Sequence, residues 1–154
     1  DINNEADAKE AYTSIMDNVG RLAPEARIKG IFVTKMIPPG EEVIIGLKRD
    51  SSFGPTIMFG LGGLFVEIFK DVGFRIAPVD AHSADMMIDE IKMTQILKGA
   101  RGRKPRDLET LKLCIQRISQ MAVDCPEIQE LDINPLIVLE KGKGAFVADA
   151  KIML

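Results

Sequence analysis

Residues 128–154 read IQELDINPLIVLEKGKGAFVADAKIML, and they predict an antiparallel two-stranded ribbon at the end of the chain. Residues 128–139 first alternate apolar and polar side chains and then continue apolar, which is typical of a strand with at least one buried face. Residues 140–144 (EKGKG) predict a turn, and residues 145–154 predict the return strand. The register of this ribbon decides which of its polar side chains meet.

That register brings three oxygen-bearing side chains together. Asp132 and Asn134 are two residues apart and therefore project from the same face of a strand. If the turn is centred between Lys141 and Gly142, Asp149 lies directly opposite Asn134, with their Cβ atoms ~5 Å apart. Two carboxylates at one place repel each other, and a hard divalent cation such as Mg²⁺ relieves this repulsion by taking oxygen ligands. The trio predicts a magnesium site; the alternative is an exposed polar face with the ribbon's lysines as counterions.

The segments before the ribbon predict an α+β domain. An apolar stripe over residues 8–22, capped by Asn3 or Asn4, predicts a helix packed in the core. Two further helices are expected, from Ser83 to about residue 97 and from Asp107 to just before Pro126. Strands are expected at 30–37, 42–47, 56–59, 64–69 and 74–77, the last two as a hairpin around residues 71–73. Short links between strands favour antiparallel pairing, so we expect a mostly antiparallel sheet with helices packed on one face.

Composition excludes several classes of protein. The chain has 154 residues, about the length of one domain, and 46% of them are hydrophobic. With 20 Lys+Arg against 23 Asp+Glu, the net charge of −3 argues against nucleic-acid binding. No apolar run approaches the ~20 residues of a transmembrane helix, so no membrane partner is expected. The polar, acidic start is unlike a signal peptide, and because it lacks Met we expect a fragment or a processed product.

The two cysteines and the single histidine do not predict a disulfide framework, a zinc site or a catalytic triad. Cys114 and Cys125 are too few for a disulfide framework and are not spaced as a zinc pair. Cys114 falls on the apolar stripe of a predicted helix, so we expect a reduced core thiol and a cytoplasmic protein. His82, the only histidine, is expected in an exposed loop, which disfavours a Ser-His-Asp triad.

Three further features have a functional and a structural interpretation. The glycine-rich residues 60–63 (GLGG) can cradle phosphate oxygens or can form a simple bulge or turn. The five cations of residues 98–106 can hold a phosphate-bearing ligand or can be a solvated loop. Glu67 can act as a ligand or base or can be an exposed edge residue, and Glu42 can accept hydrogen bonds from a ribose, although no spacing shows it.

Long, ordered motifs then resemble a known family. They cover residues 35–50 (KMIPPGEEVIIGLKRD), 53–72 (FGPTIMFGLGGLFVEIFKDV), 74–78 (FRIAP), 99–102 (GARG) and 130–136 (ELDINPL). The chain resembles, from about residue 8 to its end, the ATP-grasp region of NDP-forming acyl-CoA synthetases. That group includes the ADP-forming acetyl-CoA synthetases with their beta subunits, and succinyl-CoA synthetase is a more distant relative.

The resemblance implies an acid–CoA ligase that interconverts carboxylate, CoA and ATP with acyl-CoA, ADP and phosphate. A phosphohistidine carries the phosphoryl group between sites, and Mg²⁺ bridges the phosphates of ATP or ADP. The implied fold is the C-terminal ATP-grasp subdomain, spanning residues 1–154.

The resemblance also assigns site residues. The metal ligands fall on Asn134 and Asp149, with Asp132 beside them, and Glu42 matches a position that contacts the ribose. The segment whose backbone reads adenine matches Thr34, Lys35, Met36 and Ile37. The positions near the phosphates match Gly62, Gly63 and Arg101, and Lys151 is a phosphate contact or a supporting residue.

Parts of the family's pattern are missing from these residues. The N-terminal ATP-grasp subdomain would precede Asp1, and the CoA-binding domain with the phosphohistidine belongs to another segment or subunit; His82 matches no such position. The fragment alone is therefore expected to bind ATP weakly and to turn nothing over. Two alternatives remain open: a non-catalytic regulatory region of an acetyltransferase-fused homologue, and an assembly module whose sheet edge docks a partner.

Overall fold

A computed structural model describes residues 2–63 and 71–154, in two compact units. Unit 1 comprises Asp1–Met36 and unit 2 comprises Ile37–Leu154, where the length of the chain led us to expect one domain. We describe each unit by itself. The predicted strand at 64–69, and Glu67 with it, lies outside the described residues.

Unit 1 contains one helix, α1 (Glu5–Leu22), followed by an irregular segment. The predicted cap is confirmed, because the side chain of Asn4 accepts a hydrogen bond from the backbone N–H of Asp7 at 3.0 Å. No residue of α1 is buried within this unit, and the expected packing of its stripe in a core stays a prediction. The expected strand at 30–37 is wrong. A strand needs a partner strand, and residues 30–37 join no sheet among the described residues.

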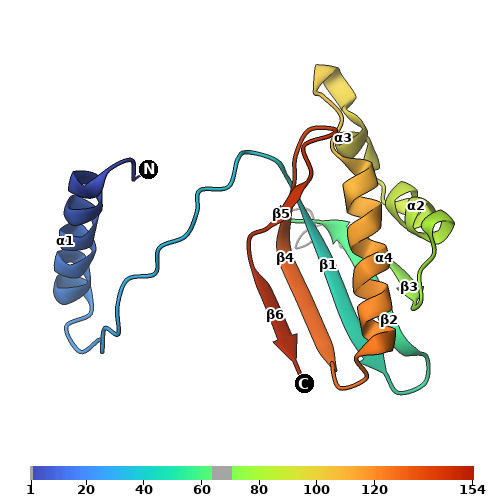
Figure 1. The fold of residues 1–154 in the computed structure, drawn as a ribbon, viewed down its shortest axis with the longest axis horizontal. Helices are drawn as coiled ribbons and strands as arrows, with labels where there is room; N and C mark the ends of the chain where they lie inside the picture. Colours follow the sequence, from blue (N-terminus) through green and yellow to red (C-terminus); the bar gives the residue numbers. More distant parts are fainter. Residues whose placement is uncertain (1, 64–70) are drawn as a thin grey trace. The chain divides into compact units, whose positions relative to one another are not determined.

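Unit 2 is a six-stranded sheet with helices on one face (Figure 1). Its order is β3-β2-β1-β4-β5, and β6 also pairs with β4. Every pairing is antiparallel, which confirms the predicted α+β class and its mostly antiparallel sheet. The strands are β1 (Glu41–Asp50), β2 (Gly54–Leu61), β3 (Val72–Ile76), β4 (Glu130–Val138), β5 (Ala145–Val147) and β6 (Ala150–Met153).

The hairpin turn expected around residues 71–73 is wrong. Val72 and Gly73 lie inside β3, which pairs with β2 and places Phe74 opposite Met58. The glycine-rich segment was expected to interrupt its strand from residue 60, but β2 continues to Leu61. Pairing with β1 on one side and β3 on the other holds this part of β2 in the sheet.

The helix expected from Ser83 to residue 97 is two helices, α2 (Ala81–Glu90) and α3 (Thr94–Lys98). The break has a visible cause: the carboxylate of Asp71 accepts hydrogen bonds from the backbone N–H groups of Lys92 and Met93, each at 3.1 Å. The cap is Asp80, one turn before the predicted position, so His82 lies in α2, not in a loop. The left-handed Gly99 ends α3 and leads into the short 3₁₀ turn η2 (Ala100–Gly102).

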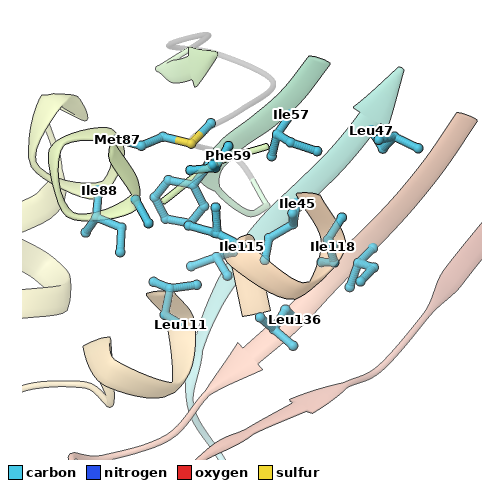
Figure 2. Close-up of a cluster of buried hydrophobic side chains, with 14 of the residues drawn as sticks. Ile45, Leu47, Ile57, Phe59, Met87, Ile88, Leu111, Ile115, Ile118 and Leu136 are labelled. Carbon is cyan, nitrogen blue, oxygen red and sulfur yellow. The ribbon is translucent and has the colours of Figure 1, made fainter. Parts of the chain in front are cut away.

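The last helix, α4 (Leu108–Asp124), begins after its predicted cap, Asp107, and crosses the sheet. Figure 2 shows the core between them, where side chains of β1, β2 and β4 meet those of α2 and α4. Cys114 packs partly against this core as a free thiol, and burial raises its pKa. Among the described residues, no helix has the length and apolar character that crossing a membrane requires.

Candidate functional site

Among the described residues the helices cover one face of the sheet, and the opposite face, the open face, carries most of the polar residues around Ile44, which is 5% exposed. Along β1, Val43, Ile45 and Leu47 belong to the core, so the residues between them face the other way. Directly opposite residues on neighbouring strands then form rows across this open face. One row runs Phe74, Met58, Gly46, Asp132 and Lys151, and the next runs Ile76, Thr56, Lys48, Glu130 and Met153.

The predicted register of the terminal ribbon is confirmed. Ile133 lies opposite Ala150 and Asp132 opposite Lys151. The backbone N–H of Asn134 donates to the carbonyl of Asp149 at 3.1 Å, which places these two residues across from each other. The turn contains Gly142 and Gly144 at φ 79° and 79°, a region in which an L side chain is strained. Their conformations let the chain reverse where the sequence predicted.

A β-bulge in β4 sets the direction of Asn134. Val43 pairs with Leu136 and Ile45 with Ile133, so the single residue Ile44 opposes both Asn134 and Pro135. Leu131 and Ile133 on one side of the bulge and Leu136 and Val138 on the other all belong to the core. The extra residue leaves Asn134 exposed without turning the apolar residues out of the core.

Glu42 and the glycine-rich turn meet at the start of β1. The backbone N–H of Gly62 donates to the carbonyl of Glu42 at 2.7 Å. A Cβ built on Gly62 would lie 2.9 Å from the Cβ of Glu42, and one built on Gly63 would lie 3.4 Å from its carboxylate Oε2. Only glycine fits at residue 62, and the Glu42 carboxylate stays exposed beside this turn.

The donor set fits a magnesium ion that shares its coordination with a ligand. Among the described residues, no three His, Cys, Asp or Glu side chains are grouped to hold a metal by themselves. The predicted set has two carboxylates and one amide, Asp132, Asn134 and Asp149, on adjacent rows of the open face. Mg²⁺ is usually held by one or two carboxylates together with substrate phosphates, so a set of this size suits it.

A groove of about 290 Å³ lies on the same face, and Gly46 is among its lining residues. Gly46 has no side chain to fill the space between Met58 and Asp132, its partners on the two neighbouring strands. Lys48, Glu130, Asp132 and Lys151 surround the hollow together with the apolar side chains of Met58, Phe74 and Met153.

The cationic loop is tied into the fold. Lys98 pairs with Asp89 at 2.8 Å and Lys104 with Glu140 at 3.3 Å. Arg103 and Arg106 lie 4.0 and 3.3 Å from the carboxylate of Glu41. Hydrogen bonds from Lys143 and Lys104 lower the pKa of Glu140. Four of the five cations thus have carboxylate partners, which favours a structural role for the loop; the side chain of Arg101 lies outside what the structure describes.

The predicted adenine segment falls at the boundary of the two units. Thr34, Lys35 and Met36 end unit 1, and Ile37 begins unit 2, shortly before β1.

The sequence analysis did not identify Gly46, Lys48 and Glu130 as residues that line the groove. The signal was present, because a single glycine in a β-branched strand often marks a place where a ligand approaches the backbone.

The fold and this face together define the class of the protein. The family model described as an ATP-grasp domain matches residues 1–154, and the chain belongs to this family.

Curated relatives carry ligase names. The chain is 46% identical over 153 residues to 4-hydroxybutyrate–CoA ligase [ADP-forming] of Nitrosopumilus maritimus, covering 99% of this chain and 22% of that protein. It is also 46% identical over 153 residues to the beta subunit of acetate–CoA ligase [ADP-forming] I of Pyrococcus furiosus, covering 99% of this chain and 65% of that subunit. The chain therefore spans less than two thirds of the length of both relatives.

Solved structures agree in fold. Acetyl-coenzyme A synthetase 1 of Ca. Korarchaeum cryptofilum, in complex with coenzyme A and Mg-AMPPCP, matches with a TM-score of 0.85 and 43% identity over 100% of this chain and 66% of that chain. In that complex the phosphohistidine segment points towards the nucleotide binding site. A further complex of the same enzyme, with coenzyme A and acetyl-coenzyme A, matches with a TM-score of 0.87 and 47% identity over 100% of this chain and 68% of that chain.

Proposed function

We propose that the chain is the C-terminal part of the nucleotide site of an ADP-forming acyl-CoA synthetase. The whole enzyme would interconvert carboxylate, CoA and ATP with acyl-CoA, ADP and phosphate through a phosphohistidine. The observation that carries this proposal is the ribbon register, which sets Asn134 across from Asp149 on the open face of the sheet. The ligase names of the relatives support the activity and disfavour a non-catalytic regulatory role.

The nucleotide would lie along β1. Thr34, Lys35, Met36 and Ile37 would contact adenine through their backbone, and the Glu42 carboxylate, held beside Gly62 and Gly63, would accept hydrogen bonds from the ribose hydroxyls. The phosphates would then extend toward the row that contains Asn134. Lys151, which lies opposite Asp132 on β6, would neutralise phosphate charge, and Arg101 stays a candidate for the same role.

Asn134 and Asp149, with Asp132 beside them, would hold the magnesium ion. When bound, the ion neutralises negative charge on the phosphates, which is its usual contribution to phosphoryl transfer. The chain's own residues do the rest by positioning: the glycine turn fixes Glu42, and the bulge keeps Asn134 exposed.

The partners follow from the length of the relatives. An N-terminal ATP-grasp subdomain would complete the nucleotide site, as the greater length of the relatives supports. Another domain or subunit would bind CoA and carry the phosphohistidine. A cytoplasmic location remains a prediction that rests on the two free thiols.

The test uses the full-length protein together with its CoA-binding portion. ADP formation is measured with ATP, CoA, Mg²⁺ and several short carboxylic acids, and a phosphorylated protein is trapped without CoA. We expect Asp149→Ala to lower turnover at least ~100-fold, because a metal ligand is lost at the phosphates. Gln116→Ala, on the outer side of α4, is the matched control. Turnover near the wild-type rate in Asp149→Ala would refute the metal assignment, and absence of ADP formation with every acid would refute the activity.

A further inference from the structure

We propose that Arg106 is a positioning residue of the nucleotide site: through its ion pair with Glu41, it fixes the place of the Glu42 carboxylate relative to the metal ligands. This inference rests on the proposed function, which gives Glu42 the ribose contact, and it adds the part of the chain that holds Glu42 in place. The location of the ion pair, the elements that it joins and its burial support the inference.

The ion pair lies on the other side of the sheet from the proposed ribose contact. Glu41 and Glu42 are the first two residues of β1, so their side chains leave opposite faces of the sheet. Glu41 lies opposite the core residue Val138 and therefore points to the face that the helices cover. There its Oε2 accepts a hydrogen bond from Nη2 of Arg106 at 3.3 Å, and Nη1 of Arg103 lies 4.0 Å away. The pair thus anchors β1 next to the residue that would contact the ribose.

The backbone around Arg106 is tied to the terminal ribbon. Arg106 forms an isolated antiparallel bridge with Glu140, at the start of the ribbon's turn. The backbone N–H of the next residue, Asp107, donates a hydrogen bond to the carbonyl of Leu139 at 2.9 Å. β4 ends just before this junction and carries two of the three candidate metal ligands. Arg106 therefore connects the part of the site proposed for the ribose with the part proposed for the metal.

The start of β1 needs an anchor because the chain before it is irregular. Residues 23–40, all of them described, contain no helix or strand. The end of a strand opens more readily than its centre, since fewer neighbouring contacts hold it. Gly40 packs closely on β4, because a Cβ there would lie 2.6 Å from the side chain of Ile137 and 2.7 Å from the carbonyl oxygen of Val138. The ion pair adds a side-chain contact to this backbone packing.

Burial makes this ion pair matter. The side chains of Arg106 and Glu41 are 16% and 17% exposed, whereas that of Arg103 is 67% exposed. Exposed ion pairs contribute little to a fold, but removal of one member of a buried pair leaves a charge without compensation. The buried Nε of Arg106 has no hydrogen-bond partner among the described residues, so the guanidinium depends on its contact with Glu41. Without Arg106, we expect the Glu41 carboxylate to turn toward water and to draw the start of β1 with it.

The test compares two nucleotides that differ only at the ribose, ADP and 2′,3′-dideoxy-ADP, which lacks both hydroxyls. Their Kd values are measured by calorimetry with Mg²⁺ in the full-length protein together with its CoA-binding portion. Because hydrogen bonds to a charged group are strong, we expect the wild type to bind ADP at least ~10-fold more tightly than the dideoxy nucleotide. Glu42→Ala removes the acceptor and should bring the ratio of the two Kd values to about 1.

Variants of the ion pair are compared by the same ratio. Arg106→Ala should reduce it to below ~3, because Glu42 is no longer held at the ribose, and Arg106→Lys, which keeps a cation near Glu41, should retain most of it. Lys98→Ala is the matched control and should leave the ratio unchanged, since Lys98 pairs with Asp89 on α2 at 2.8 Å and not with β1. Circular dichroism and melting temperature establish that each variant folds, and Arg106→Gln replaces Arg106→Ala if that variant does not.

The ratio separates positioning from a general loss of structure. A purely structural role of Arg106 would weaken the binding of both nucleotides equally and would leave the ratio as it is in the wild type. A wild-type ratio in Arg106→Ala, together with a lost ratio in Glu42→Ala, would therefore overturn the positioning role and leave the proposed function standing. A wild-type ratio in Glu42→Ala would instead refute the ribose contact of the proposed function, and this inference would fall with it.

Discussion

Asp107 ties the longest helix of unit 2 to the ribbon that carries the candidate metal ligands. Its side chain is 5% exposed. Oδ1 accepts a hydrogen bond from the backbone N–H of Thr110 at 3.1 Å and caps α4, while Oδ2 accepts one from the backbone N–H of Gly144 at 2.9 Å. Replacing this carboxylate should therefore loosen both the helix end and the turn.

The magnitude follows from the two hydrogen bonds. Loss of a helix cap costs about 1 kcal/mol, and loss of a hydrogen bond to a charged group costs about 1.5–3 kcal/mol. We expect Asp107→Ala to lower the free energy of unfolding by about 3 kcal/mol at pH 7. The amide oxygen of Asp107→Asn can still accept one of the two bonds, so this variant should lose about 1–2 kcal/mol.

The pH dependence gives a second, independent check. Burial raises the pKa of Asp107, but the hydrogen bonds from Gly144 and Thr110 outweigh it, and the net pKa lies below its ordinary value. A carboxyl with a lowered folded pKa stabilises the fold above the unfolded pKa, about 3.9, and this contribution is lost as the pH falls through the folded pKa. The difference in stability between wild type and Asp107→Asn should therefore shrink below about pH 4.

Urea unfolding of the chain, followed by circular dichroism at pH 7 and at several values down to about pH 2.5, measures both quantities. Asp124→Asn, at the exposed end of α4, is the matched control and should change stability by less than about 0.5 kcal/mol. The reasoning is refuted if Asp107→Ala is as stable as wild type at pH 7. It is equally refuted if the difference between wild type and Asp107→Asn stays constant down to about pH 2.5.

Two further changes test the supports of the site. Arg49 donates hydrogen bonds at 3.0, 2.8 and 3.2 Å to three carbonyls at and beyond the end of α4, so Arg49→Met should cost about 2–3 kcal/mol in urea unfolding; equal stability would contradict this. Gly62→Ala forces Glu42 to move, because the new Cβ would lie 2.9 Å from its Cβ. We expect the Kd of ADP, measured calorimetrically in the full-length protein, to rise about 10-fold. Gly20→Ala, with open space around it, is the control, and an unchanged Kd in Gly62→Ala would count against the ribose role of Glu42.

The sequence predicted the elements whose signals are local. The turn at residues 140–144 fixes the ribbon register because its glycines accept the left-handed conformation, and each paired residue then follows from counting. The start of α4 at Asp107 was equally predictable, because a carboxylate before an apolar helical stripe is a common cap. These predictions needed no knowledge of distant contacts.

The failed predictions depended on partners far along the chain. Nothing local to residues 83–97 indicates that Asp71 binds the backbone of Lys92 and Met93 and divides the helix. Residues 30–37 have strand-like composition, but pairing depends on a neighbouring strand, which the described chain does not supply. The composition of a segment indicates which secondary structure it prefers, and the surrounding structure decides whether the segment adopts it.

The bulge at Asn134 and Pro135 reconciles two demands that a regular strand cannot meet together. The core needs Leu131 and Ile133 and also Leu136 and Val138, which have opposite parity along β4. A one-residue slip moves every following side chain to the other face, so without the extra residue the latter two would point to the open face. The change of parity is visible in the sequence, and proline is tolerated in a sheet at a bulge. The motif DINP therefore has a structural explanation that precedes any metal: it lets one strand complete the core on one face and present Asn134 beside Asp149 on the other.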